Sequence, residues 1–550
     1  MKTISTFLLF CLIFINTKAQ SLEWITSGAG DYMYSKSDIG YSVVSNGNSV
    51  YLTGYVAGNN AKIQDTVLNE GSFSFLAKYD NSGDLKWLKT NQGVNGTDVA
   101  INSQNEIYTA YTTLYQECKI LKFDENGNVL WNKQINNIDR ITSITIDKMD
   151  NLILTGDYYP YKDSLIIEDT VIYDITRNRT NGFVMKYNSD GEFEWFNTTK
   201  IISGYGGYVL FKDLQSDNNG DIFVIGDFEL FDENDSLQIG DFYLNSESNP
   251  NYAPNYISHT DIVMTKLDSN GVFLWAKKNG GYKDDQGNRL AINEFGEVYI
   301  VGNYTDSIYF DDIKLASCGI DIYLGKINTN SEIEWVNKLG SNSCNLTSEE
   351  GRTVSIDDNK VYVGGRYPGS YFHFGSINSN DTIIYNGSNT NAGFIASYSL
   401  EGDFITVHNL KSPEDARIED IHVNNENIYI TGNFYPPSTF LNTAIPTVYN
   451  NTNHFFLASL GPSSTTNLSV LDTHKINFYP NPAKDFIIIE MQNKENMLIS
   501  ICDLSGRILL SKECFETNNK IDITSIKEGL YILRVKTDNE ICSDKLIKIN

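Results

Sequence analysis

The sequence predicts an all-β fold in which a seven-bladed β-propeller is followed by a small Ig-like β-sandwich. Short strands with alternating apolar residues are separated by Asn, Asp and Gly turns, and no stretch has the periodicity of a helix. A unit of four such strands recurs along most of the chain, which is typical of a propeller. Residues 476–550 contain short strands and hairpin turns but lack this repeat, as expected for a separate sandwich.

Each unit closes with a hairpin in which a tryptophan follows a polar turn. The clearest copy covers residues 122–131, where Asp124 and Gly127 make the turn and Trp131 lies four residues after the glycine. A turn that needs positive φ explains the glycine better than calcium does, because these turns lack the ligands of a calcium loop. We therefore interpret the tryptophans as structural residues that dock one blade on the next: Trp24, Trp87, Trp131, Trp195, Trp275 and Trp335.

Counting the strands predicts the number of blades and the way the ring closes. The second and third strands of the unit occur seven times, whereas the tryptophan strand occurs six times downstream, once with Thr406 in place of the tryptophan. The seventh unit stops at Leu460 without this strand, and an orphan copy with Trp24 opens the mature chain. We expect the two segments to pair, so that neither edge strand is exposed.

Inserts of variable length separate the second and third strands of most units. They are rich in Tyr, Asn, Ser and Asp, and the main ones cover residues 58–71, 160–180, 228–260 and 367–392. Loops on a rigid scaffold commonly carry binding residues. We therefore expect the inserts to lie on one side of the propeller and the binding function to reside there.

The chain divides into four predicted segments. Residues 1–19 combine Lys2, an apolar run and a small-residue cleavage site, as in a signal peptide. Residues 20–461 are the propeller, closed by its N-terminal strand, 462–475 have linker composition, and 476–550 are the sandwich. No later stretch is long enough for a transmembrane segment. The net charge of −27 argues against nucleic acid as a partner.

The C-terminal segment resembles the type A sorting domain of proteins exported by the type IX secretion system (Por secretion) of Bacteroidetes-type bacteria. Four motifs carry the resemblance: Phe478–Pro482, Asp503–Arg507, Gly529–Val535 and Lys545–Ile549. It implies that the secretion machinery and its processing peptidase are partners, and that the product is secreted or held at the outer cell surface. It also implies an export role for Tyr479, Pro480, Asn481, Pro482, Asp503, Gly506, Gly529, Tyr531 and Lys545.

The rest of the chain is similar to the seven-bladed propeller repeats common in such secreted proteins, most of which have no assigned activity. The Gly-x-x-x-Trp hairpin is also similar to the quinoprotein repeat, but adjacent cysteines and an eighth blade are missing. In sialidase repeats the tryptophan falls three residues after the glycine, and no cluster of arginines suited to an acidic sugar stands out. We expect no catalytic residues, no cofactor and no metal.

Two further features concern covalent modification. An Asp-Ser/Thr-aliphatic triplet in the inserts resembles the O-glycosylation motif of Bacteroidetes secreted proteins, and repeated strand starts explain it equally well. The candidate hydroxyls are Thr66, Ser164, Thr170, Ser236, Ser307 and Thr382. The six cysteines after the signal peptide lack zinc-ligand spacing, and we favour buried free thiols over a Cys318–Cys344 bridge or a pair among the last three.

These observations predict a non-catalytic surface or extracellular protein that binds an unidentified protein or glycan through its insert-bearing side. The alternative is a secreted propeller enzyme that acts on glycans or depends on a quinone. The lining of the axial channel distinguishes the two, because an enzyme needs converging carboxylates, arginines or a cofactor-sized pocket there.

Overall fold

A computed structural model describes residues 20–549 except for 32–37, 70, 93, 114–116, 161–163, 174–178, 203–205, 233, 247–258, 342–348, 358, 369–370, 377–378, 386–390, 425, 463–476, 491–496, 503–507, 516 and 538–540. The predicted signal peptide lies outside these residues, as does the predicted linker beyond Pro462. The chain separates into two compact units, Met1–Ser463 and Ser464–Asn550. Every regular element in the described part is a β-strand, which confirms the all-β prediction. The described residues contain no helix that could cross a membrane.

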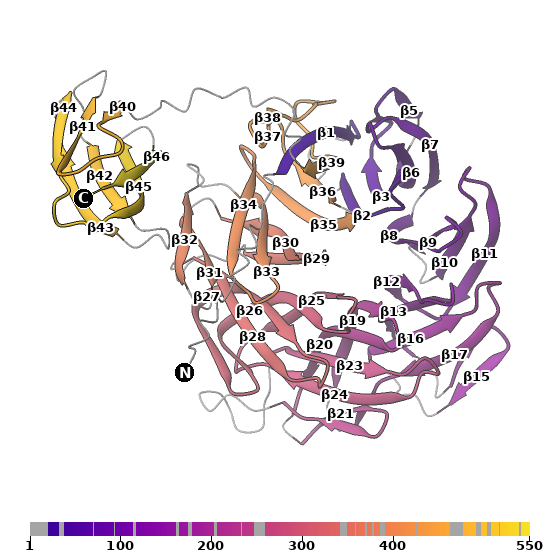
Figure 1. The fold of residues 1–550 in the computed structure, drawn as a ribbon. Coiled ribbons are helices and arrows are strands. Elements are labelled where there is room, and N and C mark those ends of the chain that lie inside the picture. The colour runs from indigo at the N-terminus through magenta and orange to yellow at the C-terminus, as the bar shows by residue number, and fades with distance from the viewer. Residues whose placement is uncertain are drawn as a thin grey trace, which may run out of the picture. The chain divides into compact units, whose positions relative to one another are not determined.

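Seven sheets of the first unit, counted over the described residues, each contain four antiparallel strands (Figure 1). From the inner to the outer strand, the first three are β2–β3–β6–β7 (Ile39–Ser45, Ser49–Ala57, Ser72–Asp80, Leu85–Gln92), β8–β9–β10–β11 (Val94–Ile101, Ile107–Thr113, Glu117–Phe123, Val129–Asn136) and β12–β13–β16–β17 (Arg140–Ile146, Leu152–Tyr158, Asn181–Tyr187, Phe193–Thr198). The next three are β19–β20–β23–β24 (Gly207–Ser216, Ile222–Leu230, Asp261–Leu267, Phe273–Asn279), β25–β26–β27–β28 (Asp285–Ile292, Val298–Phe310, Ile313–Ile327, Ile333–Gly340) and β29–β30–β33–β34 (Glu350–Ile356, Lys360–Tyr367, Ala392–Ser399, Phe404–Lys411). The last is β35–β36–β39–β1 (Ala416–Asn424, Asn427–Phe434, His454–Pro462, Gln20–Ala29).

The inner strands of these sheets surround a common centre. β2 contacts β8, the contacts continue through β12, β19, β25, β29 and β35, and β35 returns to β2 (Figure 1). Antiparallel sheets arranged radially in this way form a β-propeller. The N-terminal strand β1 pairs with β39, with Gln20 opposite Pro462 and Gly28 opposite Phe455. The first and last strands of the unit therefore lie side by side in one sheet.

A β-bulge interrupts every inner strand at the same step. In β8, for example, the pairing with β9 shifts between Gly96 and Asp98, which leaves Thr97 as the extra residue. Consecutive side chains of a regular strand point to opposite faces, whereas a bulge re-aims one of them. The extra residues of the seven bulges, called the bulge residues from here on, are Tyr41, Thr97, Thr142, Lys212, Asn288, Arg352 and Glu419.

The side chain after the bulge residue joins neighbouring inner strands. Asp98 Oδ2 accepts a hydrogen bond from the Ile144 amide at 2.9 Å, and Asp213 Oδ2 accepts one from the Leu290 amide at the same distance. Asp420 Oδ2 accepts from the amide of Val43 at 2.9 Å. Each inner strand is the edge of its sheet and has amides without a partner in the sheet. In these hydrogen bonds, a side-chain oxygen of the preceding sheet accepts from an edge amide that has no partner in its own sheet.

Most inserts are hairpins that reach the outer strand of the preceding sheet. β4–β5 (Asn60–Ile63, Thr66–Asn69) extends β1, β31–β32 (Tyr371–Ser376, Ser379–Tyr385) extends β28, and β37–β38 (Thr439–Phe440, Thr443–Ala444) extends β34. β14–β15 (Ser164–Ile167, Thr170–Tyr173) contacts β11, and β21–β22 (Ser236–Ile239, Phe242–Leu244) joins β18 (Lys200–Ile202), which follows β17. The inserts, whose polar composition resembles that of loops, thus cover outer edges as paired strands.

The tryptophans pack on the polar turn of the next sheet. Nε1 of Trp24 donates a hydrogen bond to the Asn81 carbonyl oxygen at 2.8 Å. A Cβ atom on Gly83 would lie 2.7 Å from the Trp24 ring, so glycine leaves the room that the indole occupies. Gly127, Gly191, Gly271 and Gly402 meet Trp87, Trp131, Trp195 and Trp335 in the same way. Trp275 packs on Phe223 with ring centroids 6.2 Å apart.

The second unit has two antiparallel sheets over one hydrophobic core. They are β40–β41–β44 (Asn477–Tyr479, Phe486–Glu490, Asn518–Asp522) and β43–β42–β45–β46 (Ile508–Cys514, Met497–Cys502, Gly529–Thr537, Ile541–Lys548). Ile487 and Ile521 from the first sheet share this core with Ile499 and Leu533 from the second. The unit therefore has a core of its own.

The cysteines differ in part from expectation. Cys118 and Cys514 are free. Cys318 is disulfide-bonded, so the interpretation as a free thiol is wrong at this position. Cys344, the partner that we considered from the sequence, lies outside the described residues.

We expect Gly83→Ala to destabilise the first unit more than Gly296→Ala. Both glycines have a φ of +83°, so the backbone strain on alanine is about 1 kcal/mol at each. Only at Gly83 would the new Cβ overlap an indole, which should cost a further ~1–3 kcal/mol, because the nearest atom at Gly296 is 3.9 Å away. Urea unfolding of the two variants measures the difference. Equal losses of unfolding free energy would show that the docking contact contributes nothing.

Candidate functional site

The six candidate glycosylation hydroxyls belong to the insert hairpins. They lie in the first strand of a hairpin at Ser164, Ser236 and Ser307 and in the second strand at Thr66, Thr170 and Thr382. In the first group the aliphatic residue of each triplet, Leu165, Leu237 or Ile308, is buried. Its place in the core explains these three triplets without a glycan. Val67 and Val171 of the second group are exposed, and glycosylation there stays a prediction.

The export motifs at the two ends of the second unit meet. Asn481 Oδ1 accepts a hydrogen bond from the Ile547 amide at 2.8 Å, and its Nδ2 donates to the Lys545 carbonyl oxygen at 2.7 Å. Pro480 and Pro482 flank this asparagine. The Pro-Asn-Pro turn is thereby tied to the last strand, β46.

The other export residues have local roles in the second unit. The Tyr479 hydroxyl donates to Glu490 Oε1 at 2.6 Å, and the Tyr531 hydroxyl donates to the Lys527 carbonyl oxygen at 2.9 Å. Gly529 begins β45. Asp503 and Gly506 lie outside the described residues.

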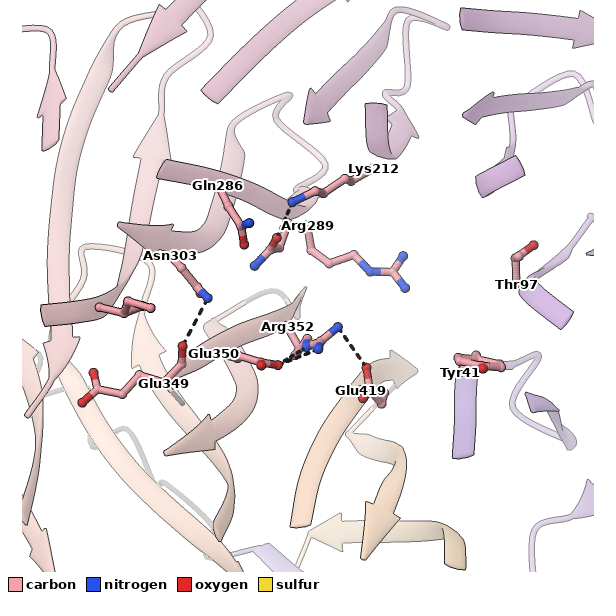
Figure 2. A pocket seen from close by; sticks show the side chains of 12 residues that line it. Tyr41, Thr97, Lys212, Gln286, Arg289, Asn303, Glu349, Glu350, Arg352 and Glu419 are labelled. Atoms are coloured by element: carbon pink, nitrogen blue, oxygen red, sulfur yellow. Dashed lines mark hydrogen bonds and ion pairs between the residues drawn. The ribbon is translucent and has the colours of Figure 1, made fainter. Parts of the chain in front are cut away.

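The propeller channel contains two cavities. The first, called the mouth pocket from here on, has a volume of about 400 Å³ and lies where the inner strands begin (Figure 2). It is lined by six of the bulge residues, all but Thr142, and by Gln286, Arg289, Asn303, Ile320, Glu349 and Glu350. In an antiparallel sheet the first strand starts at the end where the second strand finishes. The mouth pocket therefore opens on the side from which the inserts emerge.

The second cavity lies deeper in the channel and has a volume of about 330 Å³. The residues that follow the bulges line it: Ser42, Asp98, Ser143, Asp213, Arg289, Thr353 and Asp420. Burial raises the pKa of Asp420 to about 6, although the positive charge of Arg289 opposes this shift. Arg289 lines both cavities and so marks the boundary between them.

Arginines and glutamates converge at the mouth pocket. Glu350 accepts a hydrogen bond from Arg352 Nε at 2.6 Å and is also paired with Arg366. Glu419 lies 3.2 Å from Arg417 Nε and 3.7 Å from Arg352 Nη1. Burial raises the pKa of Glu350, but the arginines outweigh it and hold this pKa below its usual value. Glu350 is therefore an ionised acceptor at neutral pH.

Glu349 and Asp321 form a buried pair of carboxyl groups beside the pocket. Glu349 Oε1 accepts a hydrogen bond from the Ser341 amide at 3.1 Å, whereas Oε2 and Asp321 Oδ2 have no hydrogen-bond partner among the described residues. Lys338 Nζ lies 2.7 Å from Asp321 Oδ2 as an ion pair. Burial and the proximity of Asp321 raise the pKa of Glu349 far above its usual value. This raised pKa favours the neutral form of Glu349 at neutral pH.

The described lining of the mouth pocket is suited to holding a polar ligand. A general acid needs both a raised pKa and contact with the substrate. Glu350 has a lowered pKa, and Glu349 is only 1% exposed. No group of three or more potential metal ligands occurs in the described part of the chain. The side chains offer hydrogen bonds and charge at fixed positions.

The structure brings together arginines that do not stand out as a cluster in the sequence. Arg289, Arg352, Arg366 and Arg417 come from three consecutive sheets and are brought together by the packing of each sheet on the next. A signal was nevertheless present in the repeat. Polar or charged residues follow the inner-strand glycines Gly96, Gly287 and Gly351 directly, where an apolar alternation would otherwise continue.

Residues 477–550 match the family described as the secretion system C-terminal sorting domain. This match confirms the predicted sorting domain and places the product outside the cell or at its outer surface, after contact with the secretion machinery. The chain is also similar to the uncharacterized WD repeat-containing protein L264 of Acanthamoeba polyphaga mimivirus, with 23% identity over 395 residues. The match covers 59% of this chain and 27% of that protein, so the chain spans about a quarter of its relative.

Solved structures show similarity of fold alone. The Dos1 propeller is 8% identical, with 80% of this chain and 96% of that chain covered and a TM-score of 0.38. A protein of unknown function from Bacteroides caccae is 11% identical, with 61% and 89% covered and a TM-score of 0.30. PorZ, a surface component of the type IX secretion system of Porphyromonas gingivalis, is 11% identical, with 94% and 100% covered and a TM-score of 0.15.

We expect Glu349→Gln to flatten the pH dependence of stability. A carboxyl with a raised folded pKa stabilises the fold fully below its unfolded pKa of 4.5, and this contribution is lost as pH rises toward the folded pKa. The loss amounts to about 1.4 kcal/mol per pH unit for one group. Glutamine stays neutral and can donate from Nε2 to Asp321. Melting temperatures between pH 5 and pH 8, taken as roughly the window of this loss, should fall less steeply in the variant.

Glu401→Gln is the matched control for this measurement. Glu401 is exposed on a turn, and its substitution removes the same formal charge. The control should keep the slope of the unmodified protein. If Glu349→Gln also kept that slope, the raised pKa of Glu349 would be ruled out as a cause of the pH dependence.

Deleting residues 476–550 should leave the protein in the periplasm, because the outer-membrane step depends on the sorting domain. Cell fractionation and protease accessibility on intact cells measure the location. The first unit has its own cores and should remain folded in the truncated protein. Normal surface delivery of the truncated protein would contradict an export role for this domain.

Proposed function

We propose that the protein is an exported binding module whose ligand enters the mouth pocket. In this proposal the seven sheets are the blades of one closed propeller, and residues 476–550 are an Ig-like export domain. The observation that carries the proposal is the convergence of six bulge residues on a single pocket of about 400 Å³. A bulge repeated in every inner strand presents these side chains together, as a ligand site requires.

The pocket side chains are held in place before any ligand arrives. Asn288 Nδ2 donates to the Gly351 carbonyl oxygen at 2.7 Å, and Asn303 Oδ1 accepts from the Gly351 amide at 2.9 Å. Lys212 Nζ lies 2.6 Å from Asp227 Oδ2. Side chains fixed in this way lose little conformational freedom on binding, which favours affinity for a polar ligand.

Binding fits the pocket better than catalysis does. Converging glutamates and arginines are also what a glycan-active enzyme would need, so this alternative has an observation in its favour. However, Glu350 and Glu419 are both engaged by arginines, and Glu349 is buried. A group that must donate or accept a proton from a substrate would have to leave these partners. We therefore assign the pocket a non-catalytic role.

Blocking the mouth pocket should abolish ligand binding. Thr97→Trp places a large side chain in the lining of the pocket, and we expect the mature protein to lose at least about tenfold in affinity for its ligand on a glycan and peptide array. Asn126→Trp adds the same side chain to an exposed turn at the other end of its sheet and should bind normally. Unchanged binding by Thr97→Trp would place the site elsewhere. Conversion of the bound ligand, seen by mass spectrometry, would favour the enzyme.

A further inference from the structure

Two guanidinium groups face the mouth pocket, and each has N–H donors that make no hydrogen bond to the described residues. Arg289 from β25 and Arg352 from β29 both project into the open centre of the channel mouth (Figure 2). Arg289 donates through Nη1 to Asp213 Oδ1 at 3.2 Å, and its Nε and Nη2 donate no hydrogen bond within the described part of the chain. Arg352 directs Nε and Nη2 to Glu350, while Nη1 is 3.7 Å from Glu419, beyond hydrogen-bond distance.

The anionic partners of Arg289 and Lys212 lie outside the lining of the mouth pocket, whereas Glu350 and Glu419, the partners of Arg352, belong to it. Asp213, which pairs with Arg289, lines the deeper cavity and not the mouth pocket. Asp227, which pairs with Lys212, lines neither cavity. The positive ends of Arg289 and Lys212 thus form part of the pocket surface. Burial lowers the pKa of Arg352, but the charges of Glu419 and Glu350 outweigh it and raise this pKa. Repulsion by Arg289 opposes the rise.

We propose that the mouth pocket selects a ligand that carries a carboxylate, which would bridge the open donors of Arg289 and Arg352. This inference rests on the proposed function and specifies the chemistry of its ligand. A planar carboxylate matches the fork of a guanidinium and can accept from two of them at once. An anion between the two arginines also removes the repulsion between them.

The neighbouring glutamates favour a carboxylate over a phosphate. Glu350 and Glu419 line the same pocket and bring negative charge close to the ligand. These glutamates offset the two positive charges of Arg289 and Arg352, so no surplus positive charge is left among the four side chains to balance the second negative charge of a phosphate dianion. The shared requirement is therefore one carboxylate on a small polar molecule, whether a sugar acid or the carboxyl group of an acylated amino acid.

Calorimetric titration of the mature protein with matched acid and neutral probes tests this inference. D-glucuronate is compared with D-glucose, and N-acetyl-L-alanine with its amide, so that the two pairs separate a sugar acid from an amino-acid carboxylate. We expect at least one acid to bind about tenfold or more tightly than its neutral counterpart. Arg289→Gln and Arg352→Gln should each remove this preference. Arg352→Lys should retain only part of it, because lysine keeps the charge without the fork.

Lys148→Gln, on the exposed turn between β12 and β13 of the propeller, also removes one positive charge and is the control, which should leave the preference intact. Circular dichroism establishes that each variant is folded, and Arg352→Lys serves if Arg289→Gln does not fold. Acids that bind no better than their neutral counterparts would overturn the carboxylate assignment. If Thr97→Trp still abolished binding of a different ligand, the proposed function would stand without the carboxylate assignment. A ligand whose binding is insensitive to Thr97→Trp would overturn both.

Discussion

The hydrogen bonds between an inner-strand amide and a buried side-chain oxygen of the preceding sheet are the interaction on which the propeller centre depends. Asp98, Asp213 and Asp420 each accept such an amide at 2.9 Å. A hydrogen bond to a charged acceptor contributes about 1.5–3 kcal/mol, and leaving the edge amide buried without a partner would cost a similar amount. The sheets are thus joined at their innermost strands, whereas the tryptophans and the insert hairpins join them from the outer strands.

This arrangement places buried carboxylates in the channel, and a nearby cation is needed to balance their charge. Arg289 is this cation, because it pairs with Asp213 and also interacts electrostatically with Asp98 and Asp420. A buried charge that loses its partner is strongly destabilising. The same arginine that balances the centre of the propeller also forms the floor of the mouth pocket. Under the proposed function, the same residue therefore serves both the stability of the propeller and the binding of the ligand.

Structural features that depend on short, repeated residue patterns could be predicted from the sequence. The turn glycines with their tryptophans, the displaced Trp24 and the C-terminal motifs each need only a few neighbouring residues to be visible. The mouth pocket could not be predicted, because its lining combines single residues from different sheets, such as Tyr41, Lys212 and Glu419. Their convergence depends on the closure of the ring and on a one-residue bulge. The polar residues after Gly96, Gly287 and Gly351 are visible in the sequence, but the sequence does not show that they meet.

The pairing of the first strand with the last has a consequence for the maturation of the exported protein. Gln20 lies opposite Pro462, so the first described residue and the start of the segment that leads to the sorting domain belong to the same pair of strands. A peptidase that cuts beyond Pro462 removes no strand and no ladder hydrogen bond from the propeller. Removal of the sorting domain would therefore require no refolding of the propeller.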